Sequence, residues 1–475
     1  MHVTKSIISK KTKGAFGMKT KYTGLENHEV TVDFNNSLGE ISYRDHSFGI
    51  GGINTLPMPD KVVSGIKKLK PKLIRIFIQE FFFIYPESGV FDWTKLDAYM
   101  DSVHAIGADI MAHITIKPKA LYPVIDENIW QPTSVSEWQS VIEALVHRYS
   151  VEKKYVTHWA MGNEINIGEL GGCPYKFTDP YEFFEYYQMT AHAIAKAYPQ
   201  AKIGGMAWAG CWQDTVDFMT EFINHAVKAN IKPDFVSYNI YEDCPHDQAN
   251  AVERIRPIVE DLGVDMYITE LNVSLVFGME ELAYLSARAA SLGATILKLS
   301  DAKLLSATFQ YHIVDMHCSV PEFEGWYSRA RYMADHWNDA PHRLGLFDWA
   351  GNPRPQYFLY QLLYSVYGER FKVEVSYPDY LHSVAAQNEN GDINVFISNF
   401  NNNDAKDIIT KIKMKSNPIG LYDIKVYRID DDKRWTNDLT LHPVEERTTY
   451  MPEDFDIPIY APANSVVLVN IKKHK

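Results

Sequence analysis

The sequence has few cysteines, no long apolar run and no excess of basic residues. Its four cysteines, among 475 residues, are widely spaced and form no CxxC pair, which excludes a zinc knuckle or a thioredoxin-type motif. No run of 18 apolar residues is present, so we expect no membrane-spanning helix. Segment 1–11 lacks the apolar core of a signal peptide, so we expect either a cytoplasmic protein or a secreted or periplasmic one whose signal has been removed.

The balance of charge limits the partners that the protein can have. Its formal net charge is −13, from 47 basic and 60 acidic residues, and such a surface repels nucleic acid and anionic membranes. This composition favours a neutral substrate such as an oligosaccharide or glycoside. We expect no cofactor and no metal ion.

Short apolar strands alternate with amphipathic helices over residues 46–369, which is typical of a parallel α/β fold. Eight strand cores are predicted, the number that closes a (β/α)8 TIM barrel. They are Phe48–Ile53, Leu73–Ile78, Asp109–Ile114, Val156–Met161, Lys202–Met206, Phe235–Ile240, Met266–Thr269 and Ser306–Tyr311.

Glycines mark the expected ends of several barrel helices, because a residue with positive φ often follows a helix. Gly107 and Gly263 occupy such positions, and Gly263 would end a helix predicted over Gln248–Leu262. Gly293 would likewise end a helix predicted over Glu280–Leu292.

The pattern changes after the barrel to short alternating runs separated by Asn, Asp and Gly turns. Residues 370–475 are therefore predicted to form a C-terminal β-sandwich. Segment 1–45 contains another alternating run, His28–Phe34, which we expect to add an N-terminal strand to the β-sandwich.

Two glutamates stand directly after apolar runs, Glu164 in the string Trp159–Glu164 and Glu270 in the string Tyr267–Asn272. A glutamate at a strand end is by itself more often structural than catalytic. Here the two residues would end the fourth and seventh barrel strands, and catalytic residues of such barrels lie at those ends. Two carboxyl groups about 5–5.5 Å apart are the equipment of a retaining glycosidase.

These strings resemble glycoside hydrolase family 39, within the clan A retaining glycosidases, which includes β-xylosidases and α-L-iduronidases. The runs Phe91–Trp93, Asp234–Tyr241 and Gly345–Asp348 are also similar to segments of that family. The resemblance implies a TIM barrel with a β-sandwich, and a β-xylosidase-like, exo-acting enzyme. The sequence departs from the family at Asn239, where a histidine is frequent, and in the lack of a clear tryptophan after the eighth strand.

The resemblance also implies roles for particular residues. Glu164 would be the acid/base and Glu270 the nucleophile, while Asn163 would contact the sugar 2-hydroxyl. Tyr241 would donate a hydrogen bond to Glu270, and Arg75 would approach the same carboxylate. For Arg75 the alternative is a buried salt bridge at the bottom of the barrel.

Several aromatic and basic side chains are candidate substrate contacts. His113 follows the third strand and could bind a sugar hydroxyl or be a structural histidine. Trp208, Tyr311 and Trp326 lie in or near predicted loops after strands, where aromatic faces can stack on sugar rings, although a tryptophan is more often part of the core. These are predictions from position alone.

The segment from Arg329 to Arg343 is rich in arginine and histidine. It could recognise a carboxylate or sulfate on the sugar, or it could be a solvated lid whose charges neighbouring acids balance. This leaves a glycosidase for a uronic acid or another modified sugar as one alternative. A carbohydrate-binding barrel without catalysis and a metal-dependent barrel hydrolase are others.

Overall fold

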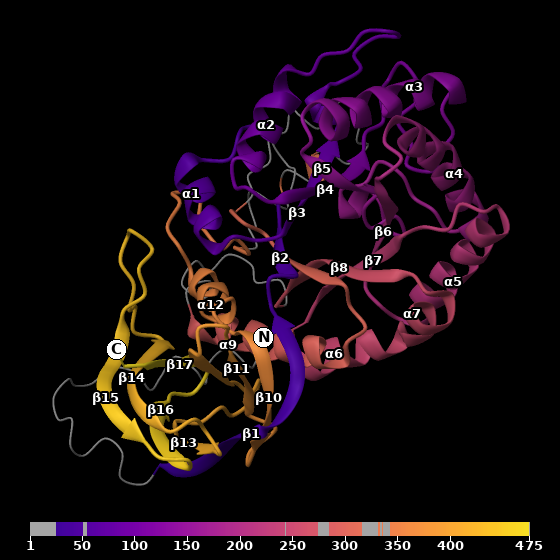
Figure 1. Ribbon diagram of the computed structural model, residues 1–475. Coiled ribbons are helices and arrows are strands. Elements are labelled where there is room, and N and C mark those ends of the chain that lie inside the picture. The colour runs from indigo at the N-terminus through magenta and orange to yellow at the C-terminus, as the bar shows by residue number, and fades with distance from the viewer. Residues whose placement is uncertain are drawn as a thin grey trace.

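The computed structural model describes residues 25–50, 55–242, 244–273, 285–315, 331, 332, 335 and 343–474. Within them, eight strands form a closed barrel and nine others form one mixed sheet. Figure 1 shows the barrel ringed by helices, with the β-sheet domain beside it. The predicted TIM barrel with an accessory β domain is therefore confirmed. No helix in the described part of the chain is long and apolar enough to cross a membrane.

The barrel strands are parallel and follow one another in chain order. They are β2 (His46–Gly49), β3 (Leu73–Gln79), β4 (Asp109–Thr115), β5 (Val156–Met161), β6 (Lys202–Ala209), β7 (Phe235–Tyr241), β8 (Asp265–Asn272) and β9 (Ala307–Tyr311). Strand β2 ends at Gly49, and part of the strand predicted over Phe48–Ile53 lies outside the described residues.

The helices cover the outside of the barrel or lie in the loops that connect its strands. They are α1 (Asp60–Leu69), η1 (Glu80–Phe82), α2 (Thr94–His104), α3 (Val135–Val146), η2 (His147–Glu152), η3 (Gly168–Gly171), α4 (Pro180–Ala197), α5 (Gln213–Lys228), α6 (Pro245–Arg254), α7 (Arg256–Leu262), α9 (Ser286–Ala302) and α12 (Pro355–Leu363).

A small apolar cluster fills the interior of the barrel and includes Met111, Phe235 and Phe309, with Leu73 packed against it. Because side chains alternate along a strand, the residue two positions after each of these also faces the interior. Arg75 follows Leu73 in this way, and His113 follows Met111. Polar groups therefore lie nearer the carboxyl ends of the strands, and the apolar cluster lies below them.

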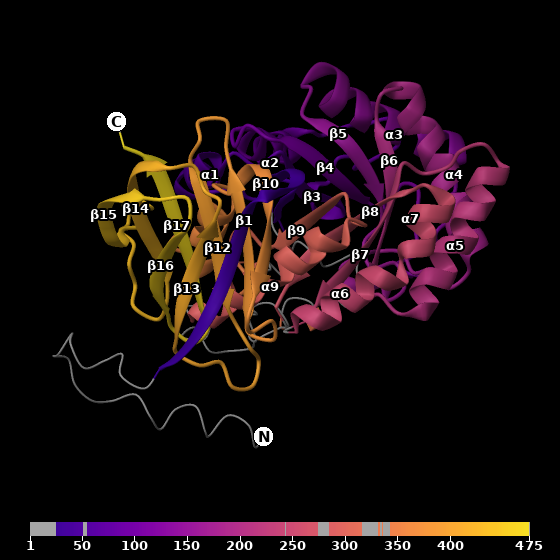
Figure 2. The ribbon, with the colours of Figure 1, turned by 60° about the horizontal axis from the view of Figure 1, so that its bottom comes forward.

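The nine-stranded sheet has the order β15-β14-β17-β12-β11-β10-β1-β13-β16. Its strands are β1 (Glu26–Ser42), β10 (Tyr367–Val375), β11 (Leu381–Gln387), β12 (Ile393–Asn399), β13 (Ile408–Lys415), β14 (Gly420–Ile429), β15 (Pro443–Met451), β16 (Phe455–Ala461) and β17 (Ser465–Lys473). Strand β1 pairs antiparallel with β10 and parallel with β13, and Figure 2 shows it crossing this domain. The predicted N-terminal strand is thus part of the β domain.

One helix prediction is wrong at Gly293, which lies within α9 instead of ending a helix. A Cβ at this position would lie 3.1 Å from Leu359 of α12 and 3.3 Å from Phe396 of β12. The glycine therefore permits close packing of a barrel helix against both α12 and the β domain. On the same contact, the Ser398 hydroxyl donates to the carbonyl of Ala290 over 2.6 Å.

The helix predicted over Gln248–Leu262 is divided into α6 and α7. Pro257 lies at the start of α7, and proline has no backbone N–H with which to continue the hydrogen bonds of the preceding helix. Gly263 caps α7 in the left-handed conformation with φ 61°, as predicted.

Candidate active site

Glu164 is held in an unusual backbone conformation beyond the end of β5. Its φ is 47°, a left-handed conformation that is costly for a residue with a side chain. Its N–H donates to the carbonyl of Ala207 over 2.7 Å, and its own carbonyl accepts from Ile167 over 2.9 Å. Ala207 lies where the pairing of β6 with β7 is irregular. This irregularity in β6 therefore fixes the backbone from which the Glu164 side chain extends.

The surroundings of Glu164 favour its protonated form. Burial raises the pKa of its carboxyl to about 8, and the charge of Glu270 acts in the same direction. A hydrogen bond from Asn239 and the charge of Arg75 oppose this shift. With a pKa of about 8, this carboxyl carries a proton at neutral pH.

Glu270 has the opposite surroundings, because both of its oxygens accept hydrogen bonds. Arg75 Nη1 lies 2.7 Å from Glu270 Oε1, and the side chains are 0% and 6% exposed. The Tyr241 hydroxyl donates to Glu270 Oε2, while burial and the charge of Glu270 raise the pKa of that hydroxyl well above its ordinary value. The Tyr241 hydroxyl therefore keeps its proton, and both this donor and the cation of Arg75 stabilise the ionised carboxylate of Glu270.

Two asparagines connect the glutamates. Asn163 Oδ1 accepts from Arg75 Nη2 over 2.6 Å and from Asn239 Nδ2 over 3.2 Å. Asn239 Nδ2 also donates to Glu164 Oε1 over 3.1 Å. One hydrogen-bonded path thus runs from Glu270 through Arg75 and the two amides to Glu164. The salt bridge of Arg75 is buried, and its partner is Glu270 itself.

His113 and Tyr311 border this cluster. His113 Nδ1 lies 3.0 Å from the carbonyl of Gly162, while Nε2 is buried without a hydrogen-bond partner among the described residues. Burial and the charge of Arg75 hold its pKa well below the ordinary value, so the ring is neutral. The guanidinium of Arg75 lies 5.7 Å from the centre of the Tyr311 ring.

Trp208 packs against a helix of the barrel. Its side chain is buried, and its ring packs against Phe218 of α5 with centroids 4.4 Å apart. Its predicted role in substrate binding stays a prediction. Trp326 lies outside the described residues, as does most of segment 329–343. Of that segment, Arg331 pairs with Asp335 over 2.9 Å, and Arg343 lies over the ring of Trp349.

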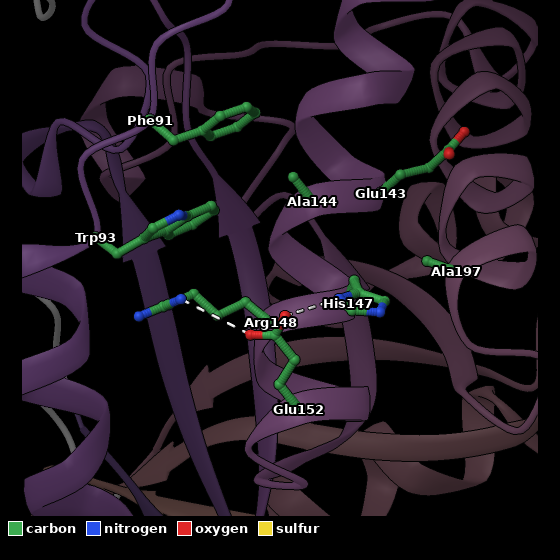
Figure 3. A pocket seen from close by; sticks show the side chains of 8 residues that line it. All are labelled: Phe91, Trp93, Glu143, Ala144, His147, Arg148, Glu152 and Ala197. Atoms are coloured by element: carbon green, nitrogen blue, oxygen red, sulfur yellow. Dashed lines mark ion pairs between the residues drawn. The ribbon is translucent and has the colours of Figure 1, made fainter.

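A cavity of about 410 Å³ on the outside of the barrel is separate from the glutamate cluster. Figure 3 shows Phe91 and Trp93 at one side of it, with their ring centroids 5.3 Å apart. Within it, Glu152 lies 3.2 Å from His147 and 3.8 Å from Arg148, while Glu143 pairs with Lys196 outside the lining over 2.8 Å. None of its lining residues belongs to the cluster around the two glutamates.

Sequence reasoning named Asn239 only as a departure from the family and gave it no contact. It also missed Thr269, whose hydroxyl donates to Asn239 Oδ1 over 2.8 Å. Gly171 was missed as well, although a Cβ there would lie only 2.3 Å from Glu164 Oε2. A polar residue at a strand end was the available signal for Asn239. No local pattern marks Gly171, because its contact depends on how the loop after β5 folds back.

Comparison with known proteins places the chain in a family. The sequence profile of glycosyl hydrolases family 39 matches residues 66–438. A β-xylosidase from Geobacillus stearothermophilus is 25% identical over 167 residues, which are 33% of this chain and 32% of that relative. The chain thus aligns with about a third of the length of that curated relative.

Solved structures share the fold. A monomeric β-xylosidase from Caulobacter crescentus CB15 has 20% identity and a TM-score of 0.72, with 94% of this chain and 100% of that chain covered. The bacterial orthologue of human α-L-iduronidase has 14% identity and a TM-score of 0.67, with 94% and 84% covered. The family profile spans the barrel from α1 onward and much of the β domain. The chain therefore belongs to glycosyl hydrolases family 39.

Proposed function

We propose that the protein is a retaining, exo-acting glycoside hydrolase in which Glu164 is the acid/base and Glu270 the nucleophile. One observation carries the proposal: two carboxyl groups share a hydrogen-bond network but have opposite surroundings. Glu164 has its pKa raised to about 8, whereas Glu270 accepts from Arg75 and a tyrosine hydroxyl. Carboxyl groups whose environments favour different charge states are the pattern of an acid and nucleophile pair.

In the first step, a Glu270 oxygen attacks the anomeric carbon while Glu164 transfers its proton to the glycosidic oxygen. The carbon–oxygen bond to the leaving group breaks, and a glycosyl ester of Glu270 forms. Arg75 and Tyr241 hold the attacking carboxylate in place by hydrogen bonds to its two oxygens. Proton transfer to the leaving group is needed most when that group is a poor one.

In the second step, water takes the place of the leaving group. Glu164, now ionised, removes a proton from the water as its oxygen attacks the anomeric carbon, and the ester bond to Glu270 breaks. Two inversions leave the configuration of the sugar unchanged, and Glu164 is protonated again.

Several neighbouring groups are proposed to hold the sugar. Asn163 Nδ2 donates one proton to the carbonyl of Gly171 over 2.8 Å, and its second N–H is proposed to meet the 2-hydroxyl. His113 Nε2, buried without a partner among the described residues, is proposed to bind another hydroxyl. The aromatic ring of Tyr311 is proposed to pack against the sugar.

A β-xyloside is the first substrate to test, because β-xylosidases occur among both the sequence relatives and the similar structures. A screen of 4-nitrophenyl glycosides, including the xyloside, glucuronide and arabinoside, tests this choice. Activity that survives a strong chelator would exclude a metal-dependent hydrolase.

The mechanism is tested with a 2-deoxy-2-fluoro glycoside that carries a good leaving group. We expect a stable ester, located by mass spectrometry on the peptide that contains Glu270, and retention of configuration by proton NMR. Glu270→Ala should lose turnover by several orders of magnitude. An inverted product, or unchanged turnover in Glu270→Ala, would contradict the mechanism. A protein that only binds carbohydrate would show no turnover and unchanged affinity in this variant.

A further inference from the structure

Asn239 links Glu164 to the rest of the active-site hydrogen-bond network. It is 1% exposed and lies in β7. Its amide nitrogen donates to Glu164 Oε1 over 3.1 Å and to Asn163 Oδ1 over 3.2 Å. An asparagine amide has two N–H groups, so both are used. Its Oδ1 accepts from the hydroxyl of Thr269 over 2.8 Å.

The orientation of this amide is fixed by its neighbours. Asn163 Oδ1 is an acceptor because Arg75, which can only donate, lies 2.6 Å from it. If the Asn239 amide were turned over, its oxygen would face both Asn163 Oδ1 and Glu164 Oε1, and oxygen would oppose oxygen. The nitrogen therefore faces the glutamate.

A protonated carboxyl group has one hydroxyl oxygen and one oxygen that remains an acceptor. Since Asn239 donates to Oε1, the proton of Glu164 belongs on Oε2. A Cβ at Gly171 would lie 2.3 Å from Oε2 and 2.4 Å from Cβ of Glu164. Glycine at this position therefore leaves room for the whole Glu164 side chain.

We propose that Asn239 is a positioning residue that holds Glu164 by Oε1 and thereby directs its transferable proton to Oε2. The inference rests on the proposed role of Glu164 as acid/base. An amide does not titrate, so Asn239 donates in the same way while Glu164 acts as an acid and then as a base. A histidine at this position, which is frequent in the family that the sequence resembles, would add a second titrating group.

The charge state of Glu164 reflects groups from several strands. Glu270 of β8 raises its pKa, and Arg75 of β3 lowers it. The hydroxyls of Tyr241 of β7 and Tyr311 of β9 also interact with it, and the pKa of each hydroxyl is raised well above the ordinary value, first by burial. The hydrogen bond from Asn239 lowers the pKa of Glu164, so removal of the bond should raise it.

The test compares Asn239→Ala and Asn239→Asp with wild type on aryl glycosides of the accepted sugar, beginning with xylosides. Asn239→Asp has nearly the same size and shape, and as a carboxylate it supplies no donor. In the pH profile of kcat/KM, the alkaline limb should move to higher pH by about one unit in Asn239→Ala. It should move further in Asn239→Asp, because the negative charge of the new carboxylate also raises the pKa of Glu164. For phenyl glycosides, kcat/KM should fall by about 10–100-fold, but it should fall much less for 2,4-dinitrophenyl glycosides, which need no acid.

Asn166→Ala is the matched control. Asn166 lies two residues after Glu164, and its amide accepts from Ala209 N over 2.9 Å and donates to Ala209 O over 3.2 Å. This variant removes a nearby amide of the same size, so it should move neither the alkaline limb nor the dependence on leaving group.

The outcomes separate this inference from the proposed function. If both Asn239 variants keep the wild-type limb and the wild-type dependence on leaving group, the inference is overturned while the glycosidase assignment stands. An equal loss of kcat/KM with all leaving groups, with no shift of the limb, would also overturn it, because that indicates general structural damage. If Glu164→Ala is indistinguishable from wild type, the proposed function itself fails.

Discussion

Glu164→Gln should change how the stability of the protein depends on pH. Burial and the charge of Glu270 raise the pKa of Glu164 in the folded protein from 4.5 to about 8. The folded state therefore binds a proton that the unfolded state releases between these pH values. The stability linked to this group is fully present below pH 4.5 and is lost as the pH rises to about 8.

The size of this loss follows from the two pKa values. A difference from 4.5 to about 8 in the pKa of Glu164 corresponds to at most roughly 5 kcal/mol in the free energy of unfolding. Glutamine is uncharged at every pH and keeps an oxygen that can accept from Asn239. The free energy of unfolding of Glu164→Gln minus that of wild type should therefore grow by a few kcal/mol between pH 4.5 and pH 8 and then level off.

Urea unfolding at several pH values measures this difference, and the titrating groups that do not interact with Glu164 cancel because both proteins contain them. Glu389→Gln is the control, because Glu389 is an exposed residue in a turn, and its difference from wild type should stay nearly constant with pH. If the difference for Glu164→Gln is also constant, or grows toward acid, Glu164 is not protonated at neutral pH and the reasoning fails.

Other substitutions test the rest of the network. Tyr241→Phe removes a donor to Glu270 and should lower kcat/KM by about 10–100-fold; unchanged kinetics would show that the hydroxyl is dispensable. Gly171→Ala places a Cβ 2.3 Å from Glu164 Oε2 and should lower kcat/KM most for poor leaving groups, and an equal loss for all leaving groups would speak against displacement of the acid. Arg75→Met leaves Glu270 buried without its cation and should lower the free energy of unfolding, measured with urea, by about 3–5 kcal/mol. A decrease below about 1 kcal/mol would contradict a stabilising buried ion pair.

The sequence was sufficient for the architecture and for the position of the two glutamates at strand ends, because both follow from local patterns. Apolar runs identified the strands, and a carboxyl residue directly after such a run lies at the mouth of a barrel. The prediction for Gly293 was wrong because its role depends on a contact between elements that are distant in sequence. A glycine that ends a helix and a glycine that admits a neighbouring helix look the same in sequence, and only the close approach of Leu359 of α12 distinguishes them.

The contacts of Asn239 could not be predicted, because they depend on register. Pairing between β7 and β8 shifts between Tyr238 and Asn239, so that Asn239 lies opposite Glu270 instead of Thr269. In the same region, the irregular pairing of β6 with β7 supplies the carbonyl that holds the backbone of Glu164. Such irregularities leave no reliable trace in the pattern of apolar residues.

In the proposed mechanism, Glu164 acts as an acid and then as a base, and the shared network accounts for this change of role. Burial accounts for the largest part of the raised pKa of Glu164, and the charge of Glu270 adds to it. In the proposed glycosyl ester, Glu270 no longer carries that charge, whereas Arg75 and the donor Asn239 remain. Arg75 and Asn239 still lower the pKa of Glu164, but the negative charge of Glu270 no longer raises it. The pKa of Glu164 should therefore fall once the ester forms. The same carboxyl that gave up its proton to the leaving group is thereby favoured as a base at the moment when water must be activated.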